Sequence, residues 1–196
     1  DLIVRIVPGD ANVLDLGCGD GALLRELRAN KGVAGRGVEI DEDNIIRCME
    51  RGLSVTQRDL DEGLGDYPDG SYDYVILNQT LQVIMKPAEV IREMLRVGRY
   101  AIVGFPNFAH WQLRSTLFFN GRMPVSPVLP FQWYDTPNIH LLTISDFREF
   151  CRSWNIIIDT EQYFIAGRWR HAGFWRSWAN LLAVHGVFIL RGTSPK

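Results

Sequence analysis

The chain has 196 residues, of which 46% are hydrophobic and 22% charged, an ordinary balance for a soluble protein with one domain and one sizeable core. The net charge of -2 gives no global field that would attract nucleic acid. The 3 cysteines are scattered and lack C-x-x-C spacing, so we expect neither a metal site nor a disulfide framework. No apolar run could span a bilayer, so we expect no membrane partner. Reduced cysteines and the lack of a charged-then-apolar leader favour a cytoplasmic protein.

The first elements of the chain surround a glycine-rich turn. Residues 1–11 are predicted to form a short helix or lead-in. The apolar run Val13–Leu16 then indicates a buried parallel strand, and Leu23, Leu24 and Leu27 recur at helical spacing after the turn. Strand, turn and helix make the first half of a βαβ unit. The glycines permit backbone angles that side chains forbid and let a ligand approach bare main chain near the helix amides.

Two ligand classes fit this turn. Gly17, Gly19 and Ala22 match the dinucleotide pattern G-x-G-x-x-G/A. With Asp15 and Gly21 the same turn matches D-x-G-x-G-x-G, which resembles motif I of the class I S-adenosylmethionine (SAM) methyltransferases. The second match is more specific, because it adds the strand-end acid and a third alternate glycine. A glycine-rich turn that binds nothing is the remaining alternative.

Acidic residues follow the next two predicted strands. Strand 35–40 contains Glu39, about 20 residues after the glycines, where an acid accepts hydrogen bonds from ribose hydroxyls in dinucleotide and SAM folds alike. Otherwise Glu39 is a surface carboxylate. Asp41 is predicted to cap a helix whose apolar face carries Ile45, Ile46 and Met49. Asp59 follows strand 53–57 and is interpreted equally as an acceptor for an adenine amino group or as a turn carboxylate.

The central part of the chain continues the alternation of strands and helices. Strand 71–78 ends at Asn78, which would face the cleft above the glycine turn together with residues 79–83. A helix is predicted from Pro87 to the residue before Gly98, and a fifth strand over 100–105. The aromatic and proline-rich stretch 106–142 is too long for an ordinary connector. It is either a lid or substrate wall or an insertion packed against the sheet edge, and it contains a predicted helix near 111–119.

The last part of the chain predicts a helix from Ile144 with Ser145 as its cap, a strand over 155–160 and a final strand over 187–191. Cations and aromatics interleave between these strands, at Arg168, Trp169, Arg170, His171, Trp175, Arg176 and Trp178. The interleaving favours either a partner-binding surface or tryptophans that cover the core.

These elements predict one α/β domain over 1–196, with a doubly wound, mostly parallel, Rossmann-like sheet of seven strands. Because no long helix separates the last two strands, they would pair antiparallel. An antiparallel last strand is typical of the class I SAM methyltransferase fold rather than of a nicotinamide dehydrogenase.

Several longer segments are similar to those of the MetW family of methionine biosynthesis proteins. The resemblance covers nearly the whole chain and rests on these runs: Val13–Gly21, Gly37–Asp41, Gln57–Asp61, Tyr72–Gln82, Gly104–Phe108 and Thr136–Phe147. It implies a SAM-binding fold that acts with a homoserine O-acyltransferase of MetX type in methionine synthesis.

The resemblance also implies a binding site for SAM or S-adenosylhomocysteine, for which the expected residues are Asp15, Gly17, Cys18, Gly19, Gly21, Glu39, Ile40, Asp59, Leu60 and Asn78. The glycines would meet the methionyl part, Asp15 the amino group, Glu39 the ribose, and Asn78 the methyl region. His110, His140 and Tyr134 are candidate bases, but none has an orienting partner in the sequence, so no catalytic residue is assigned. The function is then a regulatory subunit of the acyltransferase, or alternatively a small-molecule methyltransferase, with a nicotinamide oxidoreductase a distant third.

Overall fold

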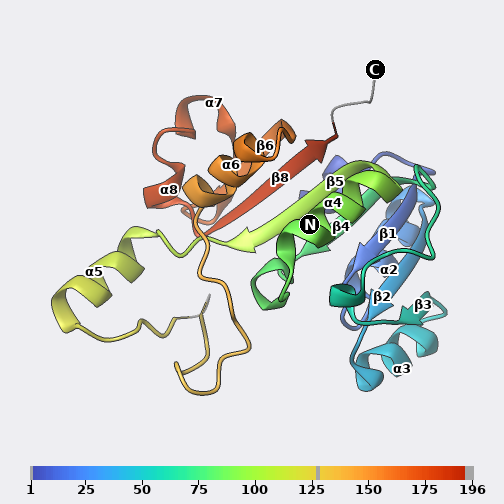
Figure 1. Cartoon of the computed structure of the whole chain (residues 1–196), viewed down its shortest axis with the longest axis horizontal. Helices are drawn as coiled ribbons and strands as arrows, with labels where there is room; N and C mark the ends of the chain where they lie inside the picture. Colours follow the sequence, from blue (N-terminus) through green and yellow to red (C-terminus); the bar gives the residue numbers. More distant parts are fainter. Residues whose placement is uncertain (1, 127–128, 193–196) are drawn as a thin grey trace.

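One mixed sheet of eight strands forms the centre of the structure, a computed structural model that describes residues 2–126 and 129–192 (Figure 1). The strand order is β3-β2-β1-β4-β5-β8-β6-β7. The strands are β1 Asn12–Leu16, β2 Ala34–Glu39, β3 Ser54–Gln57, β4 Tyr72–Asn78, β5 Gly98–Pro106, β6 Ile157–Ile165, β7 Arg168–His171 and β8 His185–Arg191. β1 to β5 pair in parallel, whereas β8 is antiparallel to both β5 and β6. The predicted fold class and its antiparallel last strand are therefore confirmed.

The predicted number of seven strands was wrong, because the segment after β6 folds back as a further strand. Ile165 pairs with Arg168, and the two residues between them, Ala166 and Gly167, have φ of 49° and 77°. Two consecutive positive φ values are the signature of the tight hairpin turn that suits twisted strands. The cations and aromatics of 168–171, for which no strand was predicted, therefore form the edge strand β7.

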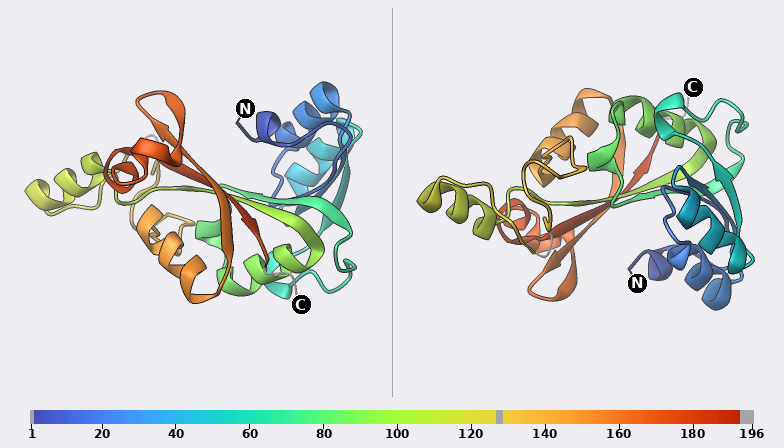
Figure 2. Two further views of the ribbon diagram at one scale, coloured as in Figure 1. Left: turned by 90° about the horizontal axis from the view of Figure 1, so that it is seen from above. Right: turned by 90° about the horizontal axis from the view of Figure 1, so that it is seen from below.

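Helices cover both faces of the sheet (Figure 2). The N-terminal helices lie on one face and α4 and α6 on the other. The α-helices are α1 Leu2–Ile6, α2 Ala22–Lys31, α3 Glu42–Glu50, α4 Pro87–Val97, α5 Trp111–Asn120, α6 Ile144–Ser153, α7 Ala172–Trp175 and α8 Ala179–Leu182, and short 3-10 helices span Leu60–Glu62 and Leu81–Val83. Among the described residues no helix is long and apolar enough to cross a bilayer.

Alternation along the strands divides the core into two layers. Leu14 and Leu16 face α4 and α6, whereas Val13 packs with α1 and α2. The apolar stripe predicted for α4 is confirmed, because Val90 and Met94 are buried.

Helix α3 shows that an apolar stripe does not by itself decide which residues of a helix are buried. Asp41 is its cap as predicted, since Oδ1 accepts a hydrogen bond from Asn44 N at 2.9 Å. The expected packed face was wrong, because Ile46 and Met49 are exposed and Cys48 is the buried residue. The helix packs beside the short edge strand β3, where no further element covers its outer side.

The cap of α6 also differs from the prediction. Thr143, not Ser145, is the N-cap, because its hydroxyl accepts from Asp146 N at 3.1 Å while Asp146 Oδ2 accepts from Thr143 N at 3.1 Å. This reciprocal capping box satisfies two amides at once, which a serine inside the first turn cannot do.

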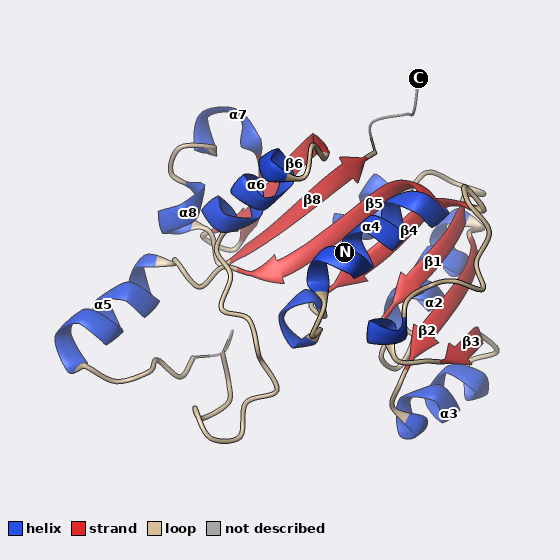
Figure 3. Cartoon of the chain, viewed as in Figure 1, coloured by secondary structure: helices blue, strands red, loops and turns tan. Residues whose placement is uncertain are grey.

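The described residues of the insertion, 106–126 and 129–142, stand away from the sheet as an arm that carries α5, and the predicted helix there is confirmed (Figure 3). Asn107 holds both ends of the arm. Its Oδ1 accepts from Ala109 N at 3.2 Å and from Ile144 N at 3.3 Å, and its Nδ2 donates to Ala183 O at 2.8 Å. Because Asn107 is buried and its amide is bonded on both sides, the root of the arm is fixed to the domain.

Candidate functional site

The carboxyl ends of β1, β2 and β4 meet at one edge of the sheet. Leu16 pairs with both Val38 and Leu77, so the turn that begins at Gly17 lies level with Glu39 and Asn78. Open α/β sheets bind their ligands at this edge, beside the point where the strand order reverses. Here that point lies between β1 and β4, so the predicted site residues gather where a ligand is expected.

The three glycines of the turn are needed for two different reasons. All have positive φ, at 66°, 54° and 74° for Gly17, Gly19 and Gly21. A Cβ on Gly17 would lie 2.6 Å from Thr80 Oγ1, and one on Gly21 would lie 2.4 Å from Leu53 Cδ1. A Cβ on Gly19 would meet nothing within 4 Å. Gly17 and Gly21 are thus required by packing, whereas Gly19 leaves bare main chain open to a ligand.

Glu39 folds back over this turn and is only 8% exposed. Its Oε2 accepts a hydrogen bond from Gly19 N at 2.7 Å, and its Oε1 accepts from Ile40 N at 2.9 Å and from Asp41 N at 3.0 Å. A carboxylate has about four acceptor positions. The backbone therefore uses most of them, and one remains for a ligand hydroxyl unless the bond to Gly19 opens.

Asp15 is more deeply buried, at 3% exposed. Burial, and secondarily the negative charge of Glu39, raises the pKa of Asp15 from 3.8 to about 7. Neither Asp15 nor Glu39 takes part in an ion pair among the described residues. The edge of the sheet thus holds two buried acids whose mutual repulsion a cationic ligand group would relieve.

Three further residues predicted for the cofactor site, Ile40, Asp59 and Leu60, follow β2 and β3, and Asp59 and Leu60 were expected beside the adenine. Ile40 is 58% exposed directly beside Glu39, although it is apolar, while Leu60 belongs to the core. Asp59 caps a turn, because its Oδ1 accepts from Asp61 N at 2.9 Å. The structure therefore shows the turn role of Asp59 that was one of its two interpretations, and leaves its second oxygen for the adenine role.

Cys18 and Asn78 fill gaps that glycines leave in neighbouring strands. Cys18 is buried, and a Cβ on Gly37 of β2 would lie 2.5 Å from its Sγ. Asn78 lies against Gly104 of β5, where a Cβ would come within 2.3 Å of its Oδ1. Burial raises the pKa of the Cys18 thiol, so this cysteine packs the turn rather than acting as a nucleophile.

The three candidate bases lie in different places. His110 precedes α5 at the root of the arm, and burial lowers its pKa. Tyr134 is exposed on the arm. His140 has a buried Nε2 without a hydrogen-bond partner among the described residues, and its main-chain N donates to Gln82 O at 3.0 Å. Among the residues that the structure describes, none of the three has a hydrogen bond or ion pair with an acidic side chain, so no catalytic residue is assigned among them.

Sequence reasoning missed a polar pair at the end of the central strands. Gln79, directly after β4, has φ of 59°, an uncommon conformation for a residue with a side chain that often marks a functional site. Its Nε2 lies 3.3 Å from Nδ1 of His185, whose pKa burial lowers. Gln79 belonged to the segment predicted to line the cleft, but His185 comes near only because β8 lies next to β5.

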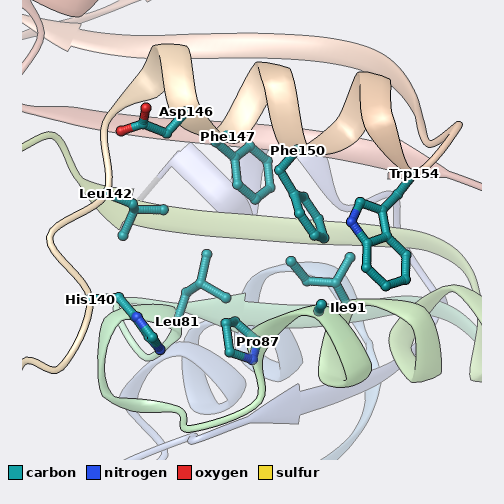
Figure 4. A pocket seen from close by; sticks show the side chains of 10 residues that line it. Leu81, Pro87, Ile91, His140, Leu142, Asp146, Phe147, Phe150 and Trp154 are labelled. Atoms are coloured by element: carbon teal, nitrogen blue, oxygen red, sulfur yellow. The ribbon is translucent and has the colours of Figure 1, made fainter.

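An apolar cavity of about 320 Å³ lies between α4 and α6, apart from the predicted site residues (Figure 4). Side chains of α6 face α4 across it, and His140 and Asp146 lie at one end. The labelled lining residues are Leu81, Pro87, Ile91, His140, Leu142, Asp146, Phe147, Phe150 and Trp154. A second cavity of about 550 Å³ lies at the root of the arm, lined by Asn107, His110, residues of α5 and the return segment 124–126.

A family model described as "Methionine biosynthesis protein MetW" matches residues 1–190. The chain belongs to the MetW family. Two individual proteins are also similar to this chain, over different shares of its length. The chain is 42% identical over 171 residues to the "Bifunctional methionine biosynthesis protein MetXA/MetW" of Rhodopirellula baltica, which covers 83% of this chain and 27% of that protein. The chain thus spans about a quarter of this longer relative's length.

The second relative is the "Ubiquinone biosynthesis O-methyltransferase" of Methylococcus capsulatus, 32% identical over 91 residues, which cover 44% of this chain and 38% of that protein. The family and the first relative are named for methionine biosynthesis, and the second relative is named as a methyltransferase.

Solved structures confirm the fold. A SAM-dependent methyltransferase from Archaeoglobus fulgidus superposes with a TM-score of 0.69 at 18% identity, over 97% of this chain and 90% of that chain. The [4+2]-cyclase SpnF superposes with a TM-score of 0.68 at 17% identity, over 100% of this chain and 80% of that one. The MetW-family chain therefore has the fold of SAM-dependent methyltransferases, and at these identities the likeness shows the fold alone.

Proposed function

We propose that this MetW-family chain binds SAM or S-adenosylhomocysteine at the carboxyl edge of its sheet and regulates or activates a homoserine O-acyltransferase. Family membership supports the role in methionine biosynthesis. The name of the Rhodopirellula baltica relative, which joins MetXA and MetW in one chain, supports the partnership. SAM is made from methionine, so its binding would let the end product act back on the pathway.

The observation that carries the proposal is the pair of buried acids beside an open stretch of main chain. SAM brings a sulfonium and an ammonium group, and both SAM and S-adenosylhomocysteine bring two ribose hydroxyls. Asp15 has no cationic partner among the described residues and would gain one from the ligand's ammonium group, directly or through water. Glu39 keeps an acceptor position for a ribose hydroxyl, and the exposed Ile40 offers an apolar surface to the adenine. The residues present therefore fit the group.

The second candidate is a small-molecule methyltransferase, which the strained Gln79 and its partner His185 favour. Bound SAM would supply an activated methyl group, so the chain would contribute chiefly by holding an acceptor in line near Asn78. A base would be needed only if the acceptor must lose a proton. Because the cyclase SpnF shares this fold, the fold does not decide between the two functions.

Calorimetric titration with S-adenosylhomocysteine tests the binding site. Glu39→Ala should weaken binding by roughly 1.5–3 kcal/mol, about tenfold to a hundredfold or more, because it removes a charged acceptor. Glu42→Ala, which removes an exposed carboxylate three residues away, is the matched control and should bind as the wild type does. Affinity should also rise with pH up to about 7, because the ligand's ammonium group favours the ionised form of Asp15.

Two further measurements separate the functions. The regulatory role predicts that the chain changes the rate of the acyltransferase and that SAM or S-adenosylhomocysteine alters this effect. The methyltransferase role predicts that SAM is converted to S-adenosylhomocysteine with a compound of the homoserine pathway. No binding of S-adenosylhomocysteine by the wild type, or displacement of it by NAD, would contradict the assigned site.

A further inference from the structure

We propose that the arm, in its described residues 106–126 and 129–142, is the surface on which the homoserine O-acyltransferase docks. The inference rests on the partnership proposed above and locates it on the chain. Two aromatic segments compete for this role, the arm and the stretch 166–180, and the structure distinguishes them by what their side chains already contact.

The arm presents two aromatic pairs to solvent. Phe118 and Phe119 of α5 are 83% and 79% exposed, and Trp133 and Tyr134 of the returning segment are 74% and 70% exposed. In each pair the rings meet edge to face, with centroids 5.0 Å and 5.6 Å apart. At 150–250 Å² per aromatic side chain, these four residues expose on the order of 500 Å² of apolar surface. That is a large part of the ~800 Å² that each partner contributes to a standard interface.

The rest of the arm extends this apolar surface. Of the described residues of α5 only Leu113 is buried, and the helix projects away from the sheet (Figure 1). Further exposed apolar side chains of the arm are Trp111, Leu117, Met123, Val125, Phe131, Ile139 and Leu141. A set of exposed apolar residues of this size marks an interaction surface rather than ordinary surface variation.

Hydrogen bonds also fix the root of the arm to the domain. Asn107 ties its two ends together, and Phe108 N donates to Leu142 O at 3.2 Å across the root. Further along the returning segment, Ile139 N donates to Gln82 O at 2.8 Å. A surface carried on a fixed root loses less conformational entropy when it binds.

The competing segment has already used half of its cations and aromatics inside the domain. The Trp169 ring is tilted against Phe164 with centroids 5.3 Å apart, and the guanidinium of Arg170 lies 5.5 Å from the centroid of the Trp175 ring. Arg176 pairs with the buried Glu161 at 3.0 Å. These contacts fix the hairpin of β7 to the domain and leave two large aromatics of the segment, Phe174 and Trp178, exposed.

The acyltransferase, rather than a second copy of this chain, is the occupant that the relatives favour. In the Rhodopirellula baltica protein the domain that matches this chain shares one polypeptide with a MetXA part. Two domains joined in one chain meet at a high effective concentration, so complementary faces on the two domains contact each other in every molecule. The arm carries more than half of the exposed large apolar side chains in the described part of this domain.

The test measures the dissociation constant between the full-length chain and the homoserine O-acyltransferase of the same organism. Two double variants remove the exposed pairs: Phe118→Ser with Phe119→Ser, and Trp133→Ser with Tyr134→Ser. Phe174→Ser, which removes an equally exposed phenylalanine (79%) outside the arm, is the matched control. We expect each double variant to bind at least tenfold more weakly and the control to bind within twofold of the wild type. Unfolding midpoints and binding of S-adenosylhomocysteine should be unchanged in all three.

The outcomes separate this inference from the proposed function. If the wild type does not bind the acyltransferase, the proposed partnership fails and the inference falls with it. If the wild type binds and both double variants bind equally well, the partnership stands and the arm is not the interface. Loss of binding in Phe174→Ser alone would place the interface at 166–180. Self-association that the double variants abolish, without any change in acyltransferase binding, would identify a second copy as the occupant and overturn the inference.

Discussion

Replacing Asp15 by asparagine should make the protein more stable at neutral and alkaline pH. Burial and the neighbouring Glu39 raise the pKa of Asp15, so between pH 4 and 7 the folded chain keeps a proton that the unfolded chain has released. The free energy of unfolding therefore falls as pH rises through this window. One pKa unit corresponds to about 1.4 kcal/mol, so the displacement from 3.8 to about 7 lowers stability by on the order of 4 kcal/mol above pH 7. Asparagine has nearly the same shape and carries no charge, so Asp15→Asn avoids this loss.

The measurement is urea unfolding of the wild type, Asp15→Asn and a control at a series of pH values from about 4 to 8.5. Asp43→Asn is a suitable control, because it removes an exposed carboxylate from the first turn of α3. The difference between Asp15→Asn and the wild type isolates Asp15, since every other group titrates in both proteins. We expect this difference to be small near pH 4, to grow through pH 7 and then to level off. The control should follow the wild type throughout.

A wild type and an Asp15→Asn variant whose stabilities change in parallel with pH would refute the reasoning. The carboxyl group of Asp15 would then titrate in the folded chain as it does in the unfolded chain. The same variant should lose affinity for S-adenosylhomocysteine, because an amide cannot pair with the ligand's ammonium group. Gain of stability with loss of binding is the pattern expected of a residue kept for function.

Two further substitutions test the packing arguments by the same unfolding measurement. Glu161→Ala should cost about 3–5 kcal/mol, because it leaves Arg148, bonded to it at 2.9 and 2.8 Å and only 17% exposed, as a half-buried charge without its carboxylate partner. Glu149→Ala in an exposed ion pair should cost less than about 1 kcal/mol. Gly21→Ala should destabilise the protein more than Gly19→Ala does, because the new Cβ at position 21 would lie 2.4 Å from a leucine side chain. Gly19→Ala should lower the free energy of unfolding by only about 1–2 kcal/mol, yet it should remove S-adenosylhomocysteine binding. Equal costs for the two glutamates, or for the two glycines, would contradict these assignments.

The local sequence determined the central unit of the fold and the position of the candidate site. The apolar run before Gly17, the alternate glycines and the leucines after them specify strand, turn and helix, because each depends on neighbouring residues alone. The acid cap Asp41 was predictable for the same reason, since a side chain bonds an amide three residues on. The parallel sheet then brought Asp15, Glu39 and Asn78 to one edge, as their positions at strand ends predicted.

Only the tertiary structure decided which side chains these elements cover and what those side chains can do. The exposed face of α3, the fold of 168–171 into β7 and the approach of His185 to Gln79 depend on segments far apart in the chain. The raised pKa of Asp15 and the open space above Gly19 likewise arise from burial and neighbours that no local pattern records. Hydrophobic spacing says that a face is apolar. Whether that face is buried in the core or left for a partner, as in the arm, depends on long-range packing.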